Sequence, residues 1–390
     1  MSAQGPLRGF RVLEFAGIGP APFCAMLLSD MGAEVLRVDR EGGMDCDVFC
    51  VESRGRRSVS LNLKSEPGHA AALKLMGQAD IVLEGFRPGV MERLGLGPEV
   101  ALGINPDLIY GRMTGWGQNG PLAAAAGHDI NYIALAGALH AMGGEDSPAI
   151  PLNLVGDFGG GALYLAMGVL AALLHVRSGG RGQVVDCAMV DGVASLLGMI
   201  YGHLGRAAGR PLASESSVNS GTWIDRRASN AIDGGAHFYN TYACADGKHI
   251  AIAAIEPTFY AQLLTRLGLE GPAYAEQMDR AAWPALKEQL SNVFRSRSRD
   301  EWCELLEGTD VCFAPVLSLQ EAPLHPHNLS RETFVKANGY YQPAPAPRFS
   351  FTPGAIQSAA PKCGEHNQEA LTDWGFSEQE ILTLQNTRSL

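Results

Sequence analysis

The chain has 390 residues, of which 46% are hydrophobic and 18% charged, and its net charge is −11 from 30 basic and 41 acidic side chains. This length predicts two domains, or one large domain with an excursion, and the acidic excess argues against nucleic acid as a partner. The eight cysteines lack the spacing of a zinc site, so we expect reduced thiols and no bound metal.

The first third of the chain predicts alternating strands and helices. The expected strands are residues 10–15, 34–38, 80–84 and 108–113, with expected helices at residues 22–31 and 69–76. Such alternation is typical of a parallel sheet with helices on its faces. We therefore predict an α/β fold with a doubly wound, Rossmann-like large domain.

The remaining two thirds predict further helices and a second, smaller domain. Residues 127–205 are rich in Ala, Leu and Met and predict largely buried helices, whereas residues 239–255 predict strands around the turn Asp246-Gly247. An amphipathic helical stretch at 278–306 and a short helix near 377–384 follow. The predicted organisation is a large α/β domain at 1–205, a linker at 206–230, a small α+β domain at 231–315, and a return segment at 316–390 that completes the large domain.

Nothing in the sequence predicts a membrane protein. The N-terminus lacks the pattern of a signal peptide, and the longest apolar run, residues 162–174, is shorter than a membrane span. We expect a soluble cytoplasmic protein, or a peroxisomal or mitochondrial one in a eukaryote. The end of the chain, Arg388-Ser389-Leu390, resembles a peroxisomal signal only loosely, and we favour an untethered terminus.

One turn resembles a dinucleotide-binding motif. Gly17 and Gly19 follow a predicted strand and open a helix, and Asp39 lies about twenty residues further on. However, Pro22 occupies the place of the third glycine, and Arg40 beside Asp39 favours a phosphate over a bare ribose hydroxyl. We prefer a tight βα turn with a proline-started helix to a nicotinamide site.

Ionisable residues interrupt three apolar segments: His128, Asp157 and Glu256. Asp157 precedes three glycines and an apolar helix, so this helix N-terminus is able to stabilise an oxyanion, as enolate chemistry requires. Helix capping explains Asp157 and Asp129 equally well. His128 is also compatible with a buried core histidine, and Glu256, directly before a proline, with an ordinary turn residue.

Several segments, in order along almost the whole chain, are similar to the type III CoA-transferase family and, within it, to the alpha-methylacyl-CoA racemases. The matching stretches are residues 21–26, 32–40, 84–90, 92–98, 127–132 (GHDINY), 156–161 (GDFGGG) and 254–257. The resemblance implies that Asp157 is the shared catalytic carboxylate. It also implies that His128 separates racemases from transferases, which typically carry glutamine there, and that Glu256 partners the histidine.

The resemblance further implies the mode of CoA binding. Of the cations in the first hundred residues, it favours Arg40, Lys64 and Arg93 as CoA contacts. It places Gly127, Asp129 and Tyr132 along the pantetheine path. It also implies an interlocked homodimer with the active site between the large domain of one chain and the small domain of the other. No metal or redox cofactor is implied, because no His/Cys cluster has ligand spacing and the chemistry needs only proton transfer. Coenzyme A is part of the substrate.

These residues predict inversion of the carbon next to a thioester by two bases. Neutral His128, oriented by Glu256, takes a proton from one face, and protonated Asp157 delivers one to the other, with the N–H of Asp157 or of its glycine neighbours stabilising the enolate. The main alternative is a CoA-transferase that acts through an anhydride at Asp157. A nicotinamide oxidoreductase and a non-catalytic acyl-CoA binder are further alternatives.

Overall fold

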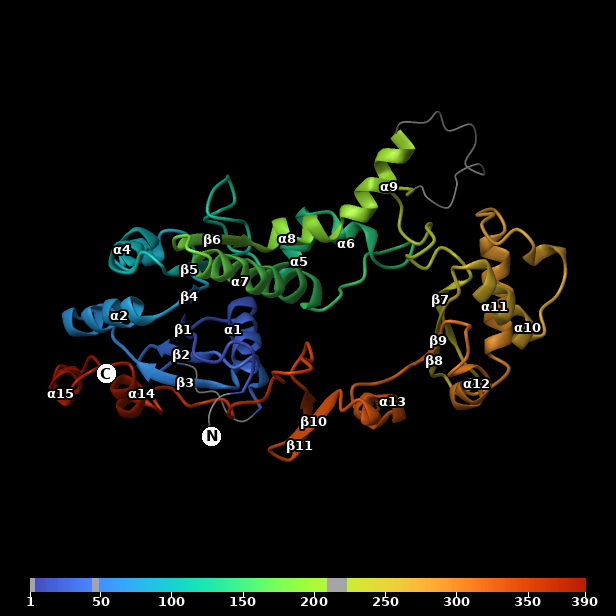
Figure 1. Ribbon diagram of the computed structural model, residues 1–390. Coiled ribbons are helices and arrows are strands. Elements are labelled where there is room, and N and C mark those ends of the chain that lie inside the picture. The colour runs from blue at the N-terminus through green and yellow to red at the C-terminus, as the bar shows by residue number, and fades with distance from the viewer. Residues whose placement is uncertain (1–3, 44–48, 209–222) are drawn as a thin grey trace. The chain divides into compact units, whose positions relative to one another are not determined.

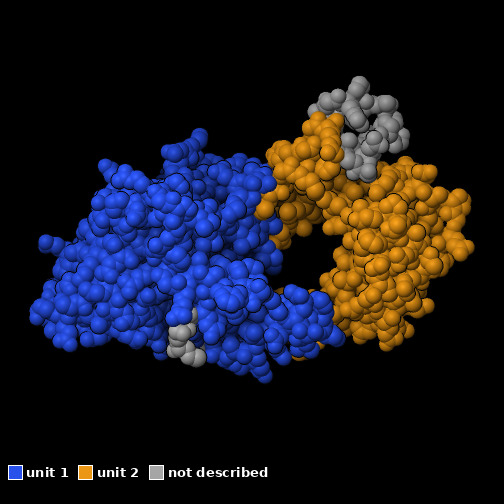
Figure 2. Space-filling model, in the orientation of Figure 1, with its two compact units in different colours: residues 1–136, 152–195, 326–390 blue, residues 137–151, 196–325 orange. Residues whose placement is uncertain are grey.

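The computed structural model describes residues 4–43, 49–208 and 223–390, and the chain divides into two compact units (Figure 2). Unit 1 comprises Met1–Ala136, Leu152–Ser195 and Pro326–Leu390, and unit 2 comprises Gly137–Pro151 and Leu196–His325. Each unit has a hydrophobic core of its own. Part of the predicted linker, residues 209–222, lies outside the described residues, as does Cys46.

Unit 1 is built on a parallel sheet of six strands in the described part of the chain (Figure 1). Its strands are β1 (Arg11–Phe15), β2 (Glu34–Asp39), β3 (Arg56–Ser60), β4 (Ile81–Glu84), β5 (Ile109–Thr114) and β6 (Gln183–Ala188). Their order in the sheet is β3-β2-β1-β4-β5-β6, and all neighbours pair in parallel. This is the doubly wound order, whose direction reverses between β1 and β4.

Adjacent residues of a strand point to opposite faces of the sheet, and here both sets are apolar, so each face is covered by helices. Val12 joins one core cluster together with α1 (Pro20–Asp30) and α7 (Leu163–Arg177). Leu13 joins a second cluster, to which α2, α3, α4, α14 and α15 contribute. These helices are α2 (Glu66–Gln78), α3 (Val90–Arg93), α4 (Pro98–Ile104), α14 (Asn367–Asp373) and α15 (Glu378–Asn386). Strands β1, β2, β4 and β5 are therefore buried on both sides.

The other elements of unit 1 follow the sheet strands or the return of the chain. Helix α5 (Asp129–Leu135) and helix α8 (Met189–Leu196) follow β5 and β6, and α8 ends at the first residue of the next unit 2 segment. In the return segment, α13 (Pro326–Ser330) precedes the hairpin of β10 (Phe334–Ala337) and β11 (Tyr340–Pro343).

Unit 2 contains an antiparallel sheet of β7 (Tyr239–Ala243), β8 (His249–Ala253) and β9 (Phe313–Val316). Helices α10 (Pro257–Leu267), α11 (Trp283–Phe294) and α12 (Arg299–Leu306) contribute to its core. The unit also holds α6 (Ala138–Ala141) and α9 (Gly198–Ala208). Helix α12 begins at a capping box in which Ser298 and Glu301 satisfy each other's backbone N–H groups.

Two strands of the unit 1 sheet depart from the sequence expectations. Strand β3 was not predicted, because its polar sequence Arg56-Arg57-Ser58 hides the fact that an ion pair buries Arg56. Strand β6 lies in a region that was predicted as helix. It is an edge strand with several exposed residues, so its sequence lacks the clear alternation of apolar and polar residues that indicates a strand. The compact units also differ from the predicted ranges: residues 137–151, 196–205 and 316–325 belong to unit 2.

Two expectations about apolar and terminal segments were wrong. Residues 154–177 form one continuous helical stretch of 24 residues that is long and apolar enough to cross a membrane, so the length argument fails. One face of this helix packs on the sheet of unit 1 instead, through Leu165 and Val169. The terminus is also tethered: Ser389 is buried, its carbonyl accepts the N–H of Asn62 (2.9 Å), and its hydroxyl lies 2.8 Å from that of Ser65.

Candidate active site

The carboxyl ends of β1 and β4 mark the place where a doubly wound sheet binds ligands. The loop after β1 carries Ile18 and Gly19, and the loop after β4 carries Phe86. These three residues line two cavities within unit 1, of about 530 Å³ and about 630 Å³. We call them the Asp157 cavity and the Arg40 cavity.

The Asp157 cavity brings together residues that are far apart in the sequence. It is lined by Gly127, His128, Tyr132 and Asp157, all of which the sequence analysis singled out. The start of helix α5 and a second helical segment, Leu154–Ala162, position them. The two candidate bases thus face one space large enough for a ligand.

Asp157 lies in a π-helical segment, Leu154–Ala162, that continues into α7. Single π-helical turns are rare and occur often at functional sites. Its carboxylate lies close to Gly19, where a Cβ atom would be 3.4 Å from Oδ2, and the side chain of Asn153 donates a long hydrogen bond to it (3.5 Å). Burial raises the pKa of Asp157 above its usual range, and the charge of Asp129 raises it further. Both effects favour the protonated form of Asp157 relative to a fully exposed carboxyl group.

Asp129 lies behind Asp157 and is not among the residues that line the cavity. Its Oδ2 accepts the backbone N–H of Asp157 at 2.7 Å, and it is buried against Gly156. This corrects the expectation that the Asp157 N–H stabilises an enolate, because that N–H already has an acceptor. The glycines after Asp157 lie within the π-helical segment, whose N–H groups bond along the helix. The amide of Asn153 remains as a donor that lines the cavity.

His128 directly precedes α5, and its backbone is held on both sides. Its N–H donates to the side chain of Asn131 (3.0 Å), and the hydroxyl of Tyr132 donates to the carbonyl of Gly127. The Tyr132 ring packs edge-on against Trp116, with centroids 4.7 Å apart. The imidazole is exposed and lines the Asp157 cavity, so a ligand in this cavity is able to reach it. His128 is not a core histidine.

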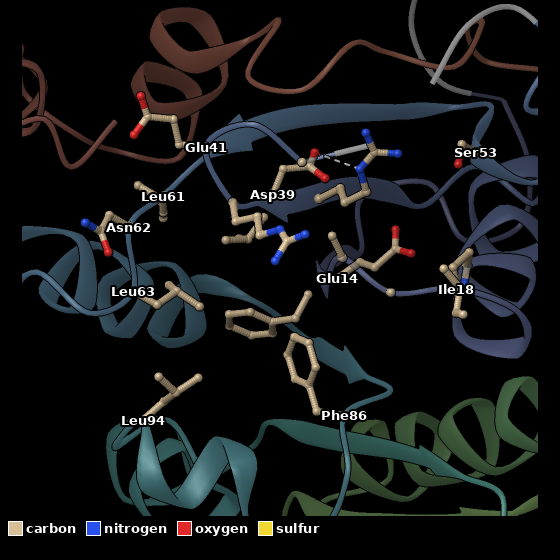
Figure 3. Close-up of a pocket in the computed structure, with 18 of the residues that line it drawn as sticks. Glu14, Ile18, Asp39, Glu41, Ser53, Leu61, Asn62, Leu63, Phe86 and Leu94 are labelled. Atoms are coloured by element: carbon tan, nitrogen blue, oxygen red, sulfur yellow. Dashed lines mark hydrogen bonds and ion pairs between the residues drawn. The ribbon is translucent and has the colours of Figure 1, made fainter. Parts of the chain in front are cut away.

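The Arg40 cavity holds two of the three cations that were expected to bind CoA. Arg40 and Lys64 line it, together with Phe86 and Leu94 of its apolar wall. Figure 3 shows this wall facing Asp39 and Glu14 across the cavity. Arg93 follows Glu92 on α3 and is exposed, but it does not line either cavity.

Among the cations of the first hundred residues, two groups differ in whether the side chain forms an ion pair. Arg37, Arg54, Arg56 and Arg57 pair with the carboxylates of Asp39, Asp30, Glu14 and Glu34. By contrast, Arg40, Lys64, Arg87 and Arg93 have no side-chain ion pair within the described residues, and all four are exposed. The charges of the second group are not neutralised by a nearby carboxylate, so these side chains are able to bind an anionic ligand.

In the dinucleotide-like motif, the carboxylate of Asp39 is not free to bind a ribose hydroxyl. Asp39 is buried, and its Oδ2 accepts hydrogen bonds from Arg37 (2.8 Å) and Ser58 (2.5 Å). Gly19 instead adopts a positive φ of 75°, which places the start of α1 beside Asp157. No group of three or more potential metal ligands occurs among the described residues.

Glu256 belongs to unit 2, where it directly precedes α10. Its side chain is exposed and makes no hydrogen bond or ion pair within the described part of the chain. The carboxylate of Glu256 is therefore uncommitted within the described residues, and the imidazole of His128 is exposed.

Sequence reasoning missed three residues that line the Asp157 cavity: Asn153, Trp116 and Arg87. Asn153 is four residues before Asp157, which is the helical spacing that brings two side chains together. Trp116 follows the end of β5, where functional residues of doubly wound sheets gather. Arg87 is one of the cations of the first hundred residues, among which the sequence analysis favoured only Arg40, Lys64 and Arg93.

Comparison with known proteins places the chain in a family. Residues 7–367 match the model of CoA-transferase family III, and the chain belongs to this family. It is 45% identical to the mouse alpha-methylacyl-CoA racemase and 42% identical to the human one, each over 98% of this chain and 97% of the relative. The family is thus established over nearly the whole chain.

More distant relatives are named as transferases. A probable fatty acyl-CoA transferase of Mycobacterium tuberculosis is 33% identical over 93% of this chain and 96% of its own length. Its crystal structure superposes with a TM-score of 0.76 at 28% identity and covers 94% of this chain and 99% of that one. A CaiB/BaiF family protein from Brucella suis has the same fold, with a TM-score of 0.78 at 24% identity, covering 95% and 100%.

Proposed function

We propose that this enzyme is an alpha-methylacyl-CoA racemase, which inverts the carbon next to the thioester of 2-methylacyl-CoA esters. The observation that carries the proposal is the meeting of His128 and Asp157 in one cavity. Relatives that bear the racemase name at 42–45% identity over nearly the full chain support it.

The chemistry follows from two bases on opposite faces of a planar enolate. In one direction neutral His128 removes the alpha proton, the electron pair moves onto the thioester oxygen, and protonated Asp157 returns a proton to the other face. The other direction exchanges the roles. Because an alpha carbon is a very weak acid, the enolate oxygen needs a hydrogen-bond donor, and one such donor contributes about 3 kcal/mol. Asn153 is our candidate, since its amide lines the cavity beside Asp157.

The CoA moiety occupies the Arg40 cavity in this proposal. Arg40 and Lys64 meet its phosphates, and the shared wall of Ile18, Gly19 and Phe86 leads the pantetheine arm to the Asp157 cavity. Gly127 and Tyr132 line that path. Asp129 does not line it and acts through its hydrogen bond to the N–H of Asp157. Arg93 is an exposed cation outside both cavities. No added cofactor is needed, because proton transfer is the only chemistry.

The alternative is a CoA-transferase, in which Asp157 attacks the thioester and forms a mixed anhydride. The names of several relatives favour it. Exposed His128 beside Asp157 favours racemisation instead, because a transferase needs no second base on the opposite face.

We also propose that the active protein is an interlocked homodimer in which Glu256 orients His128. Helix α7 supports a second copy: Leu163, Met167 and Leu174 are 52–69% exposed on one apolar helix. An exposed apolar surface of this kind is typical of an interface. Glu256, which is uncommitted within its own unit, supplies an acceptor for an imidazole N–H. The proposed location is the cytoplasm, or the peroxisome or mitochondrion in a eukaryote, without membrane or nucleic acid partners.

The test is proton NMR of one epimer of a 2-methylacyl-CoA in deuterated water. We expect the alpha proton to be replaced by deuterium and both epimers to approach a near-equal mixture without added cofactor. A free carboxylic acid serves as the acceptor in a parallel reaction. Transfer of CoA to this acid without deuterium incorporation would establish the transferase and refute the racemase.

A further inference from the structure

Unit 2 contains a buried glutamine that fixes the backbone next to Glu256. Gln277 is 8% exposed and lies in the turn before α11. Its Nε2 donates to the carbonyl oxygens of Ala254 and Ile255, both at 2.9 Å. These are the two residues that immediately precede Glu256.

This arrangement restricts the conformation of the loop. In an extended strand, successive carbonyl groups point in opposite directions, whereas here two successive carbonyls converge on one nitrogen. The two hydrogens of a single amide satisfy both, which an unbranched apolar side chain is unable to do. If the amide were absent, the two buried acceptors would repel each other and lose their partner, so the loop would relax to another conformation.

Gln277 itself is held in place by the core of unit 2. The indole N–H of Trp283 donates to its backbone carbonyl at 2.9 Å, and Trp283 packs edge-on against Phe238 with centroids 5.8 Å apart. The carbonyl of Phe238 accepts the N–H of Ala254 at 2.9 Å. The core residues Trp283 and Phe238 therefore hold the loop in two ways: Trp283 through Gln277, and Phe238 through its hydrogen bond to Ala254.

The side after Glu256 is equally fixed. The carbonyl of Glu256 accepts the N–H of Tyr260 in the first turn of α10, and the hydroxyl of Tyr260 lies 2.8 Å from Nε2 of the buried His237. In contrast, the carboxylate of Glu256 is exposed and uncommitted within the described residues. A rigid backbone that carries a free, exposed acid is suited to present this acid to a group outside its own unit.

We infer that Gln277 is a positioning residue for the reaction: it fixes the backbone at Ala254 and Ile255 so that the Glu256 carboxylate is presented in one orientation. The inference rests on the proposed role of Glu256 in orienting His128. Gln277 touches neither substrate nor the reacting atoms, so it affects catalysis only through Glu256.

The test is a double-mutant cycle on the full-length racemase, measured as deuterium exchange of a 2-methylacyl-CoA. Gln277→Met keeps the length of the side chain and removes both donors. We expect kcat to fall about tenfold, within the range for groups that orient a catalytic residue, with KM for the thioester unchanged. Glu256→Gln gives a loss of at least the same size. Adding Gln277→Met to Glu256→Gln then causes no further loss beyond about twofold.

Gln289→Ala is the matched control. Gln289 is also a glutamine of unit 2, and its side chain accepts a hydrogen bond from Tyr274 at 2.7 Å, whereas the carbonyls of Ala254 and Ile255 accept from Gln277. We expect unchanged kcat for this variant. Should Gln277→Met fail to fold, Trp283→Phe removes the indole donor that holds Gln277, together with part of the buried ring. This variant is expected to lower kcat in the same way, again without further loss in Glu256→Gln.

The outcomes are separable. If Glu256→Gln retains full activity, the proposed role of Glu256 is wrong and the inference about Gln277 falls with it, while the racemase reaction itself stands. If Glu256→Gln is impaired but Gln277→Met is not, the inference alone is overturned. Losses that multiply in the double variant also overturn it, because they place the effect of Gln277 outside Glu256.

Discussion

Replacement of Asp129 by Asn isolates the effect of one buried charge on Asp157. Asp129 Oδ2 accepts the Asp157 N–H at 2.7 Å, and its charge raises the pKa of Asp157 in addition to the effect of burial. The asparagine oxygen still accepts this N–H. Its amide nitrogen takes the place of Oδ1, a buried atom without a hydrogen-bond partner in the described structure. The variant therefore removes the charge and keeps the contact.

The structure gives the sign and size of the expected effects. Without the repulsion, the pKa of Asp157 falls, so Asp157 loses its proton at lower pH. For the epimer whose conversion needs Asp157 as the proton donor, kcat/KM falls at high pH as Asp157 loses its proton. In the variant this fall is expected at lower pH. Hydrogen bonds to charged groups are stronger than neutral ones by about 1 kcal/mol, so the exchange weakens the contact by about that amount. Asp129→Ala leaves the N–H without its acceptor and costs about 1–3 kcal/mol.

The same charge affects stability in a defined pH range. A carboxyl group whose pKa is raised in the folded state binds its proton more tightly there than in the unfolded state. Its contribution is therefore complete below the ordinary carboxyl pKa and is lost as the pH rises through the raised value. Asp129→Asn reduces this loss, so unfolding in urea at several pH values is expected to show a flatter dependence on pH for the variant.

The assay is deuterium exchange from each epimer across the pH range, with Asp107→Asn as the control for net charge, since Asp107 is exposed. The control is expected to leave both limbs in place. An alkaline limb that stays unchanged in Asp129→Asn, or moves to higher pH, would refute the argument that Asp129 raises the pKa of Asp157.

Three further predictions concern the remaining parts of the site. His128→Ala and Asp157→Ala are each expected to abolish racemisation, with losses of about 10²–10⁴-fold, and to retain slow deuterium exchange from opposite epimers; nearly full activity in His128→Ala would exclude the two-base model. Arg40→Ala is expected to raise KM and leave kcat unchanged, because phosphate contacts are the same in ground and transition states; steady-state kinetics at moderate salt tests this. In Gly115→Ala the new Cβ would lie 2.1 Å from the Tyr132 ring, so we expect the ring to be displaced, with lower activity and a lower Tm, and an unchanged variant would contradict the packing.

Local patterns in the sequence determined most of the secondary structure and the identity of the candidate bases. Strands β1, β2, β4 and β5 follow apolar runs that are buried on both faces, and such runs are visible without a structure. Asp157 before its glycines and His128 in an apolar stretch stood out because placing an ionisable group among apolar residues costs free energy, which indicates a structural or functional role. The family resemblance then supplied their roles.

Only the tertiary structure decided which partners these residues have. The sequence gives no sign that Arg56 is buried with Glu14 whereas Arg40 stays uncommitted, because the carboxylate that neutralises Arg56 lies on another strand. It likewise assigned Asp129 to the pantetheine path, although the side chain accepts the N–H of a residue 28 positions further on. Hydrogen bonds and ion pairs form between groups that are close in space, so their pairing depends on the strand order and not on local sequence.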